Sequence, residues 1–313
     1  MEKRSLFVVV IITSLVMASC QAVALSPTMQ TVETADQSQF TEQALILTEQ
    51  AVTIASFNTL IASTSTPAAI EVEITPEATE LPLYDGEVTV IDSNGLMLTL
   101  PLEVAEGAIV ETILPDDPDE GWPEFALPAR RAISFSGYSI QNHFHTPVIY
   151  IYPLEKMIQA GLYGGSVAVN LQALLEDPGF DLTVEGSLPF LPPFNAAQVF
   201  HVLEKRLDSD QNSGIRFLTL YSQAYVGIDN YDLFYTYQGI STKGSYYIAA
   251  VLPINSSLLS NEELAQLELE TIAGDYEAYI TSKKDLLIID NGLSLTPTLA
   301  ALDAMMTSII CQN

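Results

Sequence analysis

The sequence predicts an α+β fold, a mostly antiparallel sheet faced by helices, which follows an apolar N-terminal segment and a Thr/Ser/Glu-rich linker. Two observations lead to this class. Strand-like segments follow one another in runs, and helix-like segments gather between and after these runs. The globular part, residues 83–313, has about 230 residues, which is enough to bury a core of its own.

The first twenty residues have the layout of an export signal. Lys3 and Arg4 form a short positive start, and the apolar run Leu6–Met17 follows them. That run is too short to span a bilayer comfortably, and small residues lead from it to Cys20. We therefore predict a signal peptide over residues 1–19.

The tetrapeptide Met17-Ala18-Ser19-Cys20 resembles the cleavage motif of bacterial lipoproteins, with Met17 where Leu is usual. The resemblance implies that diacylglycerol is attached to Cys20 and that the chain is cleaved just before it. It also implies a location at the cell membrane, lipid-anchored on the extracytoplasmic face. The alternative is an ordinary secretory peptide that contains a cysteine. Gln21 leaves open whether the anchor lies in an inner or an outer membrane.

The chain is strongly acidic. Its formal charge is −28, and without residues 1–19 it has 38 acidic against 9 basic residues, a charge of −29. Between Ser5 and Ala129 there are 19 acidic residues and no Lys or Arg. This charge excludes nucleic acid as a partner, because nucleic acid is bound through Lys and Arg. The acidity favours solubility; the alternative is bridging by divalent cations or binding of a cationic ligand such as a peptide or polyamine.

Residues 20–82 read as a linker, flexible or partly helical, because Thr, Ser, Gln, Ala and Glu dominate their composition. Within it, residues 40–61 carry apolar positions at alternating spacings of four and three, which is typical of a coiled-coil seam. Self-association through this seam is one prediction, and a random-coil tether is the other. The seam consists of Phe40, Ala44, Leu47, Ala51, Ile54, Asn58 and Ile61.

The globular part begins with a predicted β-hairpin, in which Asn94-Gly95 supplies the positive φ angles of a tight turn. Val148–Tyr152 is apolar on both faces, which favours a central, covered strand. Val199–Leu207 has features of a capped helix, but the turn-like segment after it favours a strand. The predicted strands are 87–92, 96–102, 108–114, 132–138, 148–152, 199–207, 215–225, 233–240 and 246–252.

Four helices are predicted. Pro153 opens the first, which ends at Gly161, and the second ends before Pro178. Ser260 and Glu263 form a capping box for a helix that runs to about Ser282. Thr296-Pro297 opens the last helix, whose predicted inner face carries Leu299, Leu302, Met306 and Ile309. We interpret Cys311, which follows two isoleucines, as a buried small apolar residue.

His143-Phe144-His145 is the first candidate site. In a strand, residues two apart share a face, so both imidazoles could reach one metal ion. His201 is the only other histidine, and these three residues are the candidates for a zinc site. The pattern favours the simpler interpretation, a polar start to the strand that follows Thr146-Pro147.

Asp208, Asp210 and Asn212 are candidate calcium ligands, because their spacing resembles the start of an EF-hand loop. Ser213 stands where that loop needs Gly, and Thr219 stands where it needs Glu. A polar hairpin turn explains the segment better. Apart from the lipid on Cys20, the sequence therefore predicts no cofactor, with zinc and calcium as alternatives.

Seven tyrosines lie between residues 221 and 247. One interpretation is a surface on which a ligand stacks, but half-buried packing in strands is the favoured interpretation. The sequence contains no G-x-S-x-G, phosphate-binding Gly loop, H-E-x-x-H or C-x-x-C motif, so no catalytic motif predicts an enzymatic activity.

The block Leu188–Ile254 resembles a domain of uncharacterised bacterial extracytoplasmic proteins, and this resemblance implies neither an activity nor functional residues. The first hypothesis is a non-enzymatic, lipid-tethered domain that binds a small ligand or an envelope protein. The alternatives are an extracytoplasmic hydrolase, metal-assisted at His143 and His145, and a structural envelope component assembled through residues 40–61.

Overall fold

The computed structural model describes residues 84–119, 121–184, 186–260, 262–271 and 275–312. The predicted signal peptide, the lipidated Cys20 and the seam at residues 40–61 lie outside this part of the chain. None of the helices within it is long and apolar enough to cross a membrane.

The described residues form an α+β fold, as the sequence predicts. The strands are β1 Val88–Ser93, β2 Leu96–Pro101, β3 Gly107–Ile113, β4 Arg130–Ser136, β5 Val148–Pro153, β6 Ala197–Asp208, β7 Asn212–Ser222, β8 Phe234–Ser241, β9 Tyr246–Pro253, β10 Asn255–Ser256, β11 Leu295–Thr296 and β12 Ile310–Cys311. The helices are η1 Pro123–Phe125 (a 3-10 turn), α2 Leu154–Ala160, α3 Tyr163–Glu176, α4 Glu262–Thr271, α5 Tyr276–Asp290 and α6 Leu299–Thr307.

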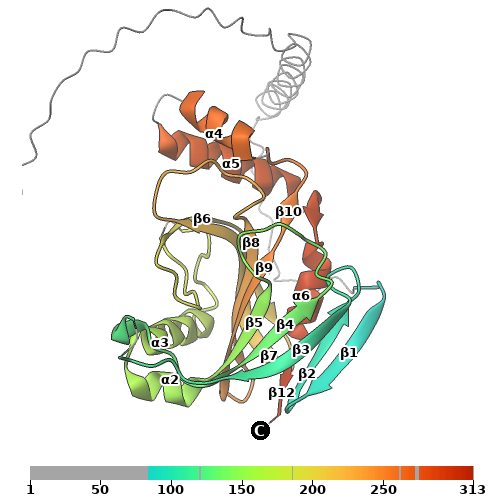
Figure 1. Cartoon of the computed structure of the whole chain (residues 1–313), viewed down its shortest axis with the longest axis vertical. Helices are drawn as coiled ribbons and strands as arrows, with labels where there is room; N and C mark the ends of the chain where they lie inside the picture. Colours follow the sequence, from blue (N-terminus) through green and yellow to red (C-terminus); the bar gives the residue numbers. More distant parts are fainter. Residues whose placement is uncertain (1–83, 120, 185, 261, 272–274, 313) are drawn as a thin grey trace, which may run out of the picture. The chain divides into compact units, whose positions relative to one another are not determined.

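A seven-stranded sheet in the order β3-β4-β5-β9-β8-β7-β6 is the centre of the fold, and every neighbouring pair in it is antiparallel. Figure 1 shows α2 and α3 on one side of this sheet and α6 with the hairpin β1–β2 on the other. The predicted strand at 199–207 and the covered central strand at 148–152 are both confirmed, as β6 and β5. Three layers result, with a core on each face of the sheet.

The two cores follow from the alternation of side chains along the strands. On β8, Phe234 faces the core under α2 and α3, whereas Tyr235 and Tyr237 face the core under β2 and α6. β9 alternates in the same way, with Tyr247 on the first side and Ile248 on the second. The sheet is therefore buried on both faces, which explains why its strands read as nearly continuous apolar runs.

The helices α2 and α3 form the layer next to the candidate site. Pro153 precedes α2, and Gly161 ends it with a left-handed φ of 65°, as predicted. Gly165 allows α3 to approach α2, because a Cβ atom at this position would lie 2.5 Å from the carbonyl oxygen of Met157. Val167, Ala168, Leu171 and Leu174 of α3 pack on the sheet.

The prediction of one helix from Ser260 to about Ser282 is wrong. Helix α4 ends at Thr271, and α5 begins at Tyr276 after Asp275, whose carboxylate accepts the backbone N–H of Ala278 at 3.0 Å. Asp275 starts a helix of its own by this cap, a role that Asp takes more readily than a place in a helix interior. Ser260 Oγ donates to the carboxylate of Glu268 at 2.6 Å.

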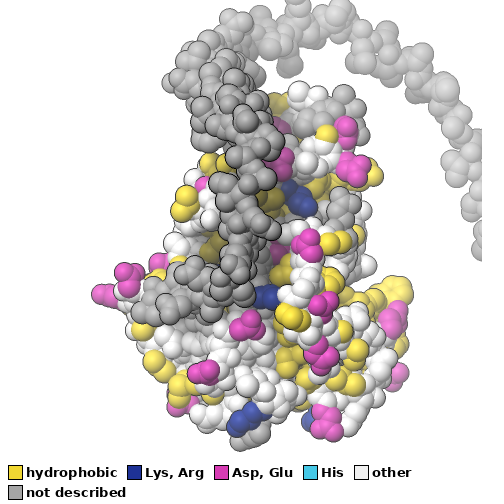
Figure 2. Space-filling view, turned by 180° about the vertical axis from the view of Figure 1, so that it is seen from behind, with side chains coloured by type: hydrophobic (Ala, Val, Ile, Leu, Met, Phe, Trp, Pro, Cys, Tyr) yellow, Lys and Arg dark blue, Asp and Glu magenta, His cyan; other side chains and the backbone are white. Residues whose placement is uncertain are grey.

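Thr298 rather than Thr296 caps the last helix, since its hydroxyl accepts the backbone N–H of Ala301 at 3.3 Å. Cys311 is half-buried in β12 and not fully buried, and it packs against the core beneath α6. Burial raises the pKa of its thiol to about 11, so this group stays protonated at neutral pH. On the face shown in Figure 2, acidic side chains are spread between apolar ones and basic side chains are few.

Candidate ligand-binding groove

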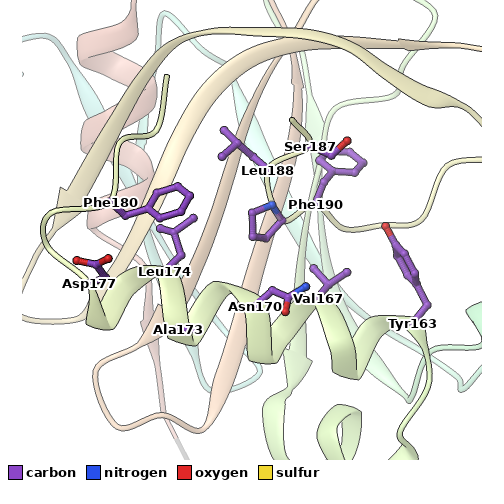
Figure 3. Close-up of a pocket in the computed structure, with 11 residues that line it drawn as sticks. Tyr163, Val167, Asn170, Ala173, Leu174, Asp177, Phe180, Ser187, Leu188 and Phe190 are labelled. Carbon is purple, nitrogen blue, oxygen red and sulfur yellow. The ribbon is translucent and has the colours of Figure 1, made fainter. Parts of the chain in front are cut away.

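Helix α3 forms the floor of a groove (Figure 3). Residues three or four apart lie on one face of a helix, so a single face of α3 runs along the whole groove. Tyr163 lies at one end of this floor, and Asp177, just after the last helical residue, lies at the other. The floor residues are Tyr163, Val167, Asn170, Ala173, Leu174 and Asp177.

The roof of the groove is the loop 178–191, which contains no helix or strand among its described residues. Its side chains lie opposite α3 in Figure 3, and the groove between them has a volume of about 470 Å³. This is within the usual range for a small-molecule site. The roof residues are Phe180, Ser187, Leu188, Pro189 and Phe190.

Three polar side chains of the sheet hold the roof loop by its backbone. His201 Nε2 donates to the carbonyl of Gly186 at 3.1 Å, and Gln198 Oε1 accepts the N–H of Leu188 at 3.2 Å. Gln238 binds both the N–H and the carbonyl of Leu191. These attachments fix the position of the loop opposite α3.

His201 is placed by a β-bulge in β6. The pairing of β6 with β7 shifts between Val202 and Lys205, where two residues of β6 stand opposite one residue of β7, so β6 contains one extra residue. Residues three apart in a regular strand point to opposite faces, but here Glu204 turns back to bind His201 Nδ1. Both side chains are buried, and the pair orients the ring towards Gly186.

Arg206, also on β6, holds the C-terminal end of the floor. Its guanidinium donates to the carbonyl oxygens of Leu174 at 2.8 Å and Asp177 at 2.5 Å. The last carbonyls of a helix have no partner within it, so this side chain from the sheet satisfies them. Floor and roof are thus tied to the same strand.

The groove is mostly apolar, with polar side chains at its two ends and at Asn170 in the middle of the floor. Asp177 is the one charged residue among the described residues that line it, while Asn170, Ser187 and the hydroxyl of Tyr163 are neutral. Burial raises the pKa of Tyr163, which therefore remains a neutral hydrogen-bonding group. Within the described lining, Ser187 has no histidine or lysine beside it that could act as a base.

An aromatic cluster continues from the roof into the core. Phe190 stacks on Tyr221 with ring centroids 4.6 Å apart, and Phe194 lies 5.0 Å from Phe190. The ring of His145 stacks on Phe194 at 5.1 Å and meets Phe234 edge-on at 4.6 Å. His145 is therefore a packing residue of this cluster.

The structure does not bring the three histidines together. His143 and His145 lie in a loop before β5, so the assumption that they share the face of a strand is wrong. His143 Nε2 donates to the carbonyl of Leu233 at 2.7 Å, and its Nδ1 accepts the N–H of His145 at 3.0 Å. Both nitrogens of His143 are occupied by backbone groups, and a metal ligand needs one of them free.

Burial lowers the pKa of His143 and lowers that of His145 to about 4, so both rings are neutral at pH 7. His201 is engaged by Glu204 and Gly186. In the described part of the chain, no three His, Cys, Asp or Glu side chains are grouped so that they could hold a metal ion.

The calcium candidates surround the hairpin between β6 and β7, which is the predicted polar turn. Asp208 ends β6 and accepts from Ser213, whereas Asp210 is exposed in the turn. Asn212 points into the core: Nδ2 donates to the carbonyls of Met306 at 3.1 Å and Ile309 at 3.0 Å, and Oδ1 accepts from Tyr237 at 2.6 Å. Its amide is thus not directed at a cation in the turn.

The tyrosines of the meander do not form one platform. Tyr235, Tyr237 and Tyr247 are fully buried, on both faces of the sheet. Tyr225 and Tyr231, the exposed members, lie in the loop after β7. Packing in strands, the favoured interpretation, accounts for the three buried rings.

Sequence reasoning missed the groove and the residues that hold it. The spacing of Tyr163, Val167, Asn170, Leu174 and Asp177 is visible in the sequence as one face of α3, which shares Val167 and Leu174 with the apolar face that packs on the sheet. No comparable pattern exists in the roof loop. A comparison with models of known protein families found no match for this chain, and no curated protein matches it either.

Proposed function

We propose that the protein is an extracytoplasmic lipoprotein, tethered through a lipid on Cys20, whose globular domain binds a small ligand with an apolar body in the groove over α3. The tether is supported by the pattern of the first twenty residues, which the sequence alone provides. The linker then lets the domain stand clear of the membrane surface.

The observation that carries the binding function is the preformed groove of about 470 Å³. Its walls are apolar, and neutral hydrogen-bonding groups stand among them. Because backbone bonds from the sheet already order the roof, a ligand does not have to order it on binding. A hydrolase at His143 and His145 has no comparable support, since the backbone occupies both nitrogens of His143.

Binding is tested with N-phenyl-1-naphthylamine, an uncharged apolar dye that fluoresces when it leaves water. The protein is the mature chain, beginning at residue 20 and carrying Cys20→Ala, so that no detergent is needed. Ala173 is exposed and lines the groove, whereas Val169 is exposed on the same helix and does not line it. We expect Ala173→Trp to weaken dye binding at least about tenfold and Val169→Trp to leave it within about twofold.

The proposal of a binding groove is overturned if the wild-type chain does not bind the dye, or if both tryptophan variants weaken binding equally. Circular dichroism of each variant verifies that the fold is retained.

The tether is tested by expressing the full chain and its Cys20→Ala variant in a bacterium and separating membrane from soluble fractions. The wild-type chain is expected with the membranes, and mass spectrometry is expected to find diacylglycerol on an N-terminal Cys20. An unmodified thiol at Cys20 contradicts the proposal.

A further inference from the structure

The groove has one charged end. Asp177 follows the last residue of α3, a helix of 14 residues, and is the charged residue among the described groove-lining side chains. The C-terminal end of a helix carries partial negative charge, which at α3 is compensated by Arg206, bound to the carbonyls of Leu174 and Asp177. The last turn of α3 itself contains no basic side chain. A cation at this end of the groove therefore gains chiefly from the carboxylate of Asp177.

The carboxylate of Asp177 forms no ion pair with a basic side chain of the described residues. Arg206 binds the backbone carbonyl of Asp177. One carboxylate oxygen accepts the N–H of Gly179 at 3.0 Å, which fixes the turn and leaves acceptor sites on the other oxygen.

Apolar and aromatic groups lie next to this carboxylate. Figure 3 shows Phe180 and Leu174 beside Asp177, and the floor continues from there to Val167. Phe180 is 42 % exposed, so one part of its ring is available to a ligand. An ammonium group beside an aromatic ring gains a cation–π contribution in addition to the carboxylate.

The length of the floor suits a chain-like molecule. Ten residues separate Asp177 from Val167, which at the helical rise corresponds to about 15 Å. An extended dodecyl chain has a comparable length. The net charge of −28 on the whole chain also raises the local concentration of cations.

We infer that the ligand is an amphipathic organic cation, an ammonium group with an apolar chain, whose charged group binds Asp177 and whose chain extends along α3 towards Tyr163. This inference rests on the proposed function, because it names the ligand class of the same groove.

The test is displacement of N-phenyl-1-naphthylamine by three dodecyl compounds below their micellar concentrations: dodecyltrimethylammonium, dodecyldimethylamine oxide and dodecanoate. At pH 8 these carry a positive charge, no net charge and a negative charge. We expect the cation to displace the dye at about one tenth of the concentration that the amine oxide needs. Dodecanoate should be the weakest of the three, because it meets the carboxylate.

The decisive variant is Asp177→Asn, with Asp181→Asn as its matched control. Asparagine can still accept the N–H of Gly179, so the turn is retained. Asp181 lies in the same loop, accepts the N–H of Thr183 at 2.9 Å and does not line the groove. Asp177→Asn should bring the cation to within about twofold of the amine oxide, and Asp181→Asn should leave the tenfold preference intact.

The inference is overturned if the three compounds displace the dye equally from the wild-type chain, a result that leaves the groove itself established. It is also overturned if Asp177→Asn and Asp181→Asn have the same effect, because the preference then comes from the overall charge. Absence of dye binding refutes the binding groove and this inference together.

Discussion

Gln238 pairs with the backbone of Leu191 through both ends of its side-chain amide. Oε1 accepts the N–H of Leu191 at 3.0 Å, and Nε2 donates to the carbonyl of the same residue, also at 3.0 Å. Oε1 also accepts the hydroxyl of Tyr247 at 2.7 Å, and Nε2 also donates to the hydroxyl oxygen of Thr236 at 2.8 Å. A fully buried and fully satisfied side chain of β8 thus fastens the roof loop to the centre of the sheet.

We expect Gln238→Leu to lower the free energy of unfolding by about 3 kcal/mol, because it leaves both backbone groups of Leu191 and the hydroxyl of Tyr247 without their buried partner. Urea unfolding measures this change. The matched control is Gln159→Leu on the exposed face of α2, expected within about 0.5 kcal/mol of the wild type. A loss below about 1 kcal/mol for Gln238→Leu contradicts the assigned role.

Asn212→Asp tests the inward orientation of Asn212. The substitution keeps the shape, removes the donor to Met306 and Ile309, and places a carboxylate against their two carbonyl oxygens. We expect a loss of about 3 kcal/mol at pH 8, measured by urea unfolding, because a buried charge without a partner is costly. Asp210→Asn in the exposed turn is the control and should change stability by less than about 0.5 kcal/mol.

Calcium should leave the melting temperature of the wild-type chain unchanged. Any ligand that binds the native state alone must raise stability by mass action. Since the amide of Asn212 is used inside the core, we expect identical calorimetric melting curves in millimolar calcium and in chelator. A rise of several degrees in calcium would restore the calcium hypothesis for Asp208, Asp210 and Asn212.

Asp232 should destabilise the fold as the pH rises. Burial, with the negative charges of Asp229 and Glu262, raises its pKa from 3.8 to about 6. The folded chain therefore binds this proton more tightly than the unfolded chain. The stability that the bound proton contributes is fully present below about pH 4 and is lost as the pH rises to about 6. Because the group is half-exposed, we expect Asp232→Asn to stabilise the protein by about 1 kcal/mol at pH 7.5.

The same variant should show no gain at pH 4, where Asp232 is already protonated in the folded chain. Urea unfolding at both pH values measures the difference. A gain of equal size at the two pH values would assign the effect to packing instead of charge.

His145 should act in the opposite direction. Its pKa falls from 6.5 to about 4, chiefly by burial and then by the neighbouring His143, so the unfolded chain binds this proton more readily. Stability is then lost as the pH falls from 6.5 towards 4. We expect His145→Phe, which keeps an aromatic ring against Phe194, to remove about 1.5 kcal/mol of this loss at pH 4.5.

At pH 8 the unfolding free energies of His145→Phe and the wild type should agree within about 1 kcal/mol, since the imidazole is then neutral like the phenyl ring that replaces it. Parallel pH profiles for the two proteins would show that His145 does not titrate in this window.

Elements whose cause is local were predictable from the sequence. Asn94 and Gly95 have φ angles of 51° and 69° in the turn between β1 and β2, and Gly161 ends α2 at 65°. In each case one or two residues carry the conformational preference, so no distant contact is needed. The antiparallel sheet followed in the same way from runs of apolar strands.

The features that build the groove depend on distant contacts and were not predictable. A strand pattern does not reveal that a bulge turns Glu204 towards His201, or that Gln238 pairs with a loop residue 47 positions away. The prediction that His143 and His145 share the face of a strand was wrong for a related reason. Spacing alone assumed a strand at residues 143–145, and the structure places a loop there.

The two attachments on strand β6 determine which molecules can enter the groove. Its His201 holds the loop above the groove and its Arg206 holds the helix below, and these two residues are five positions apart on one strand. The two walls cannot separate unless one of these attachments breaks. We therefore expect the groove to select ligands by their cross-section: slender unbranched molecules should bind, and bulky molecules of equal hydrophobicity should not.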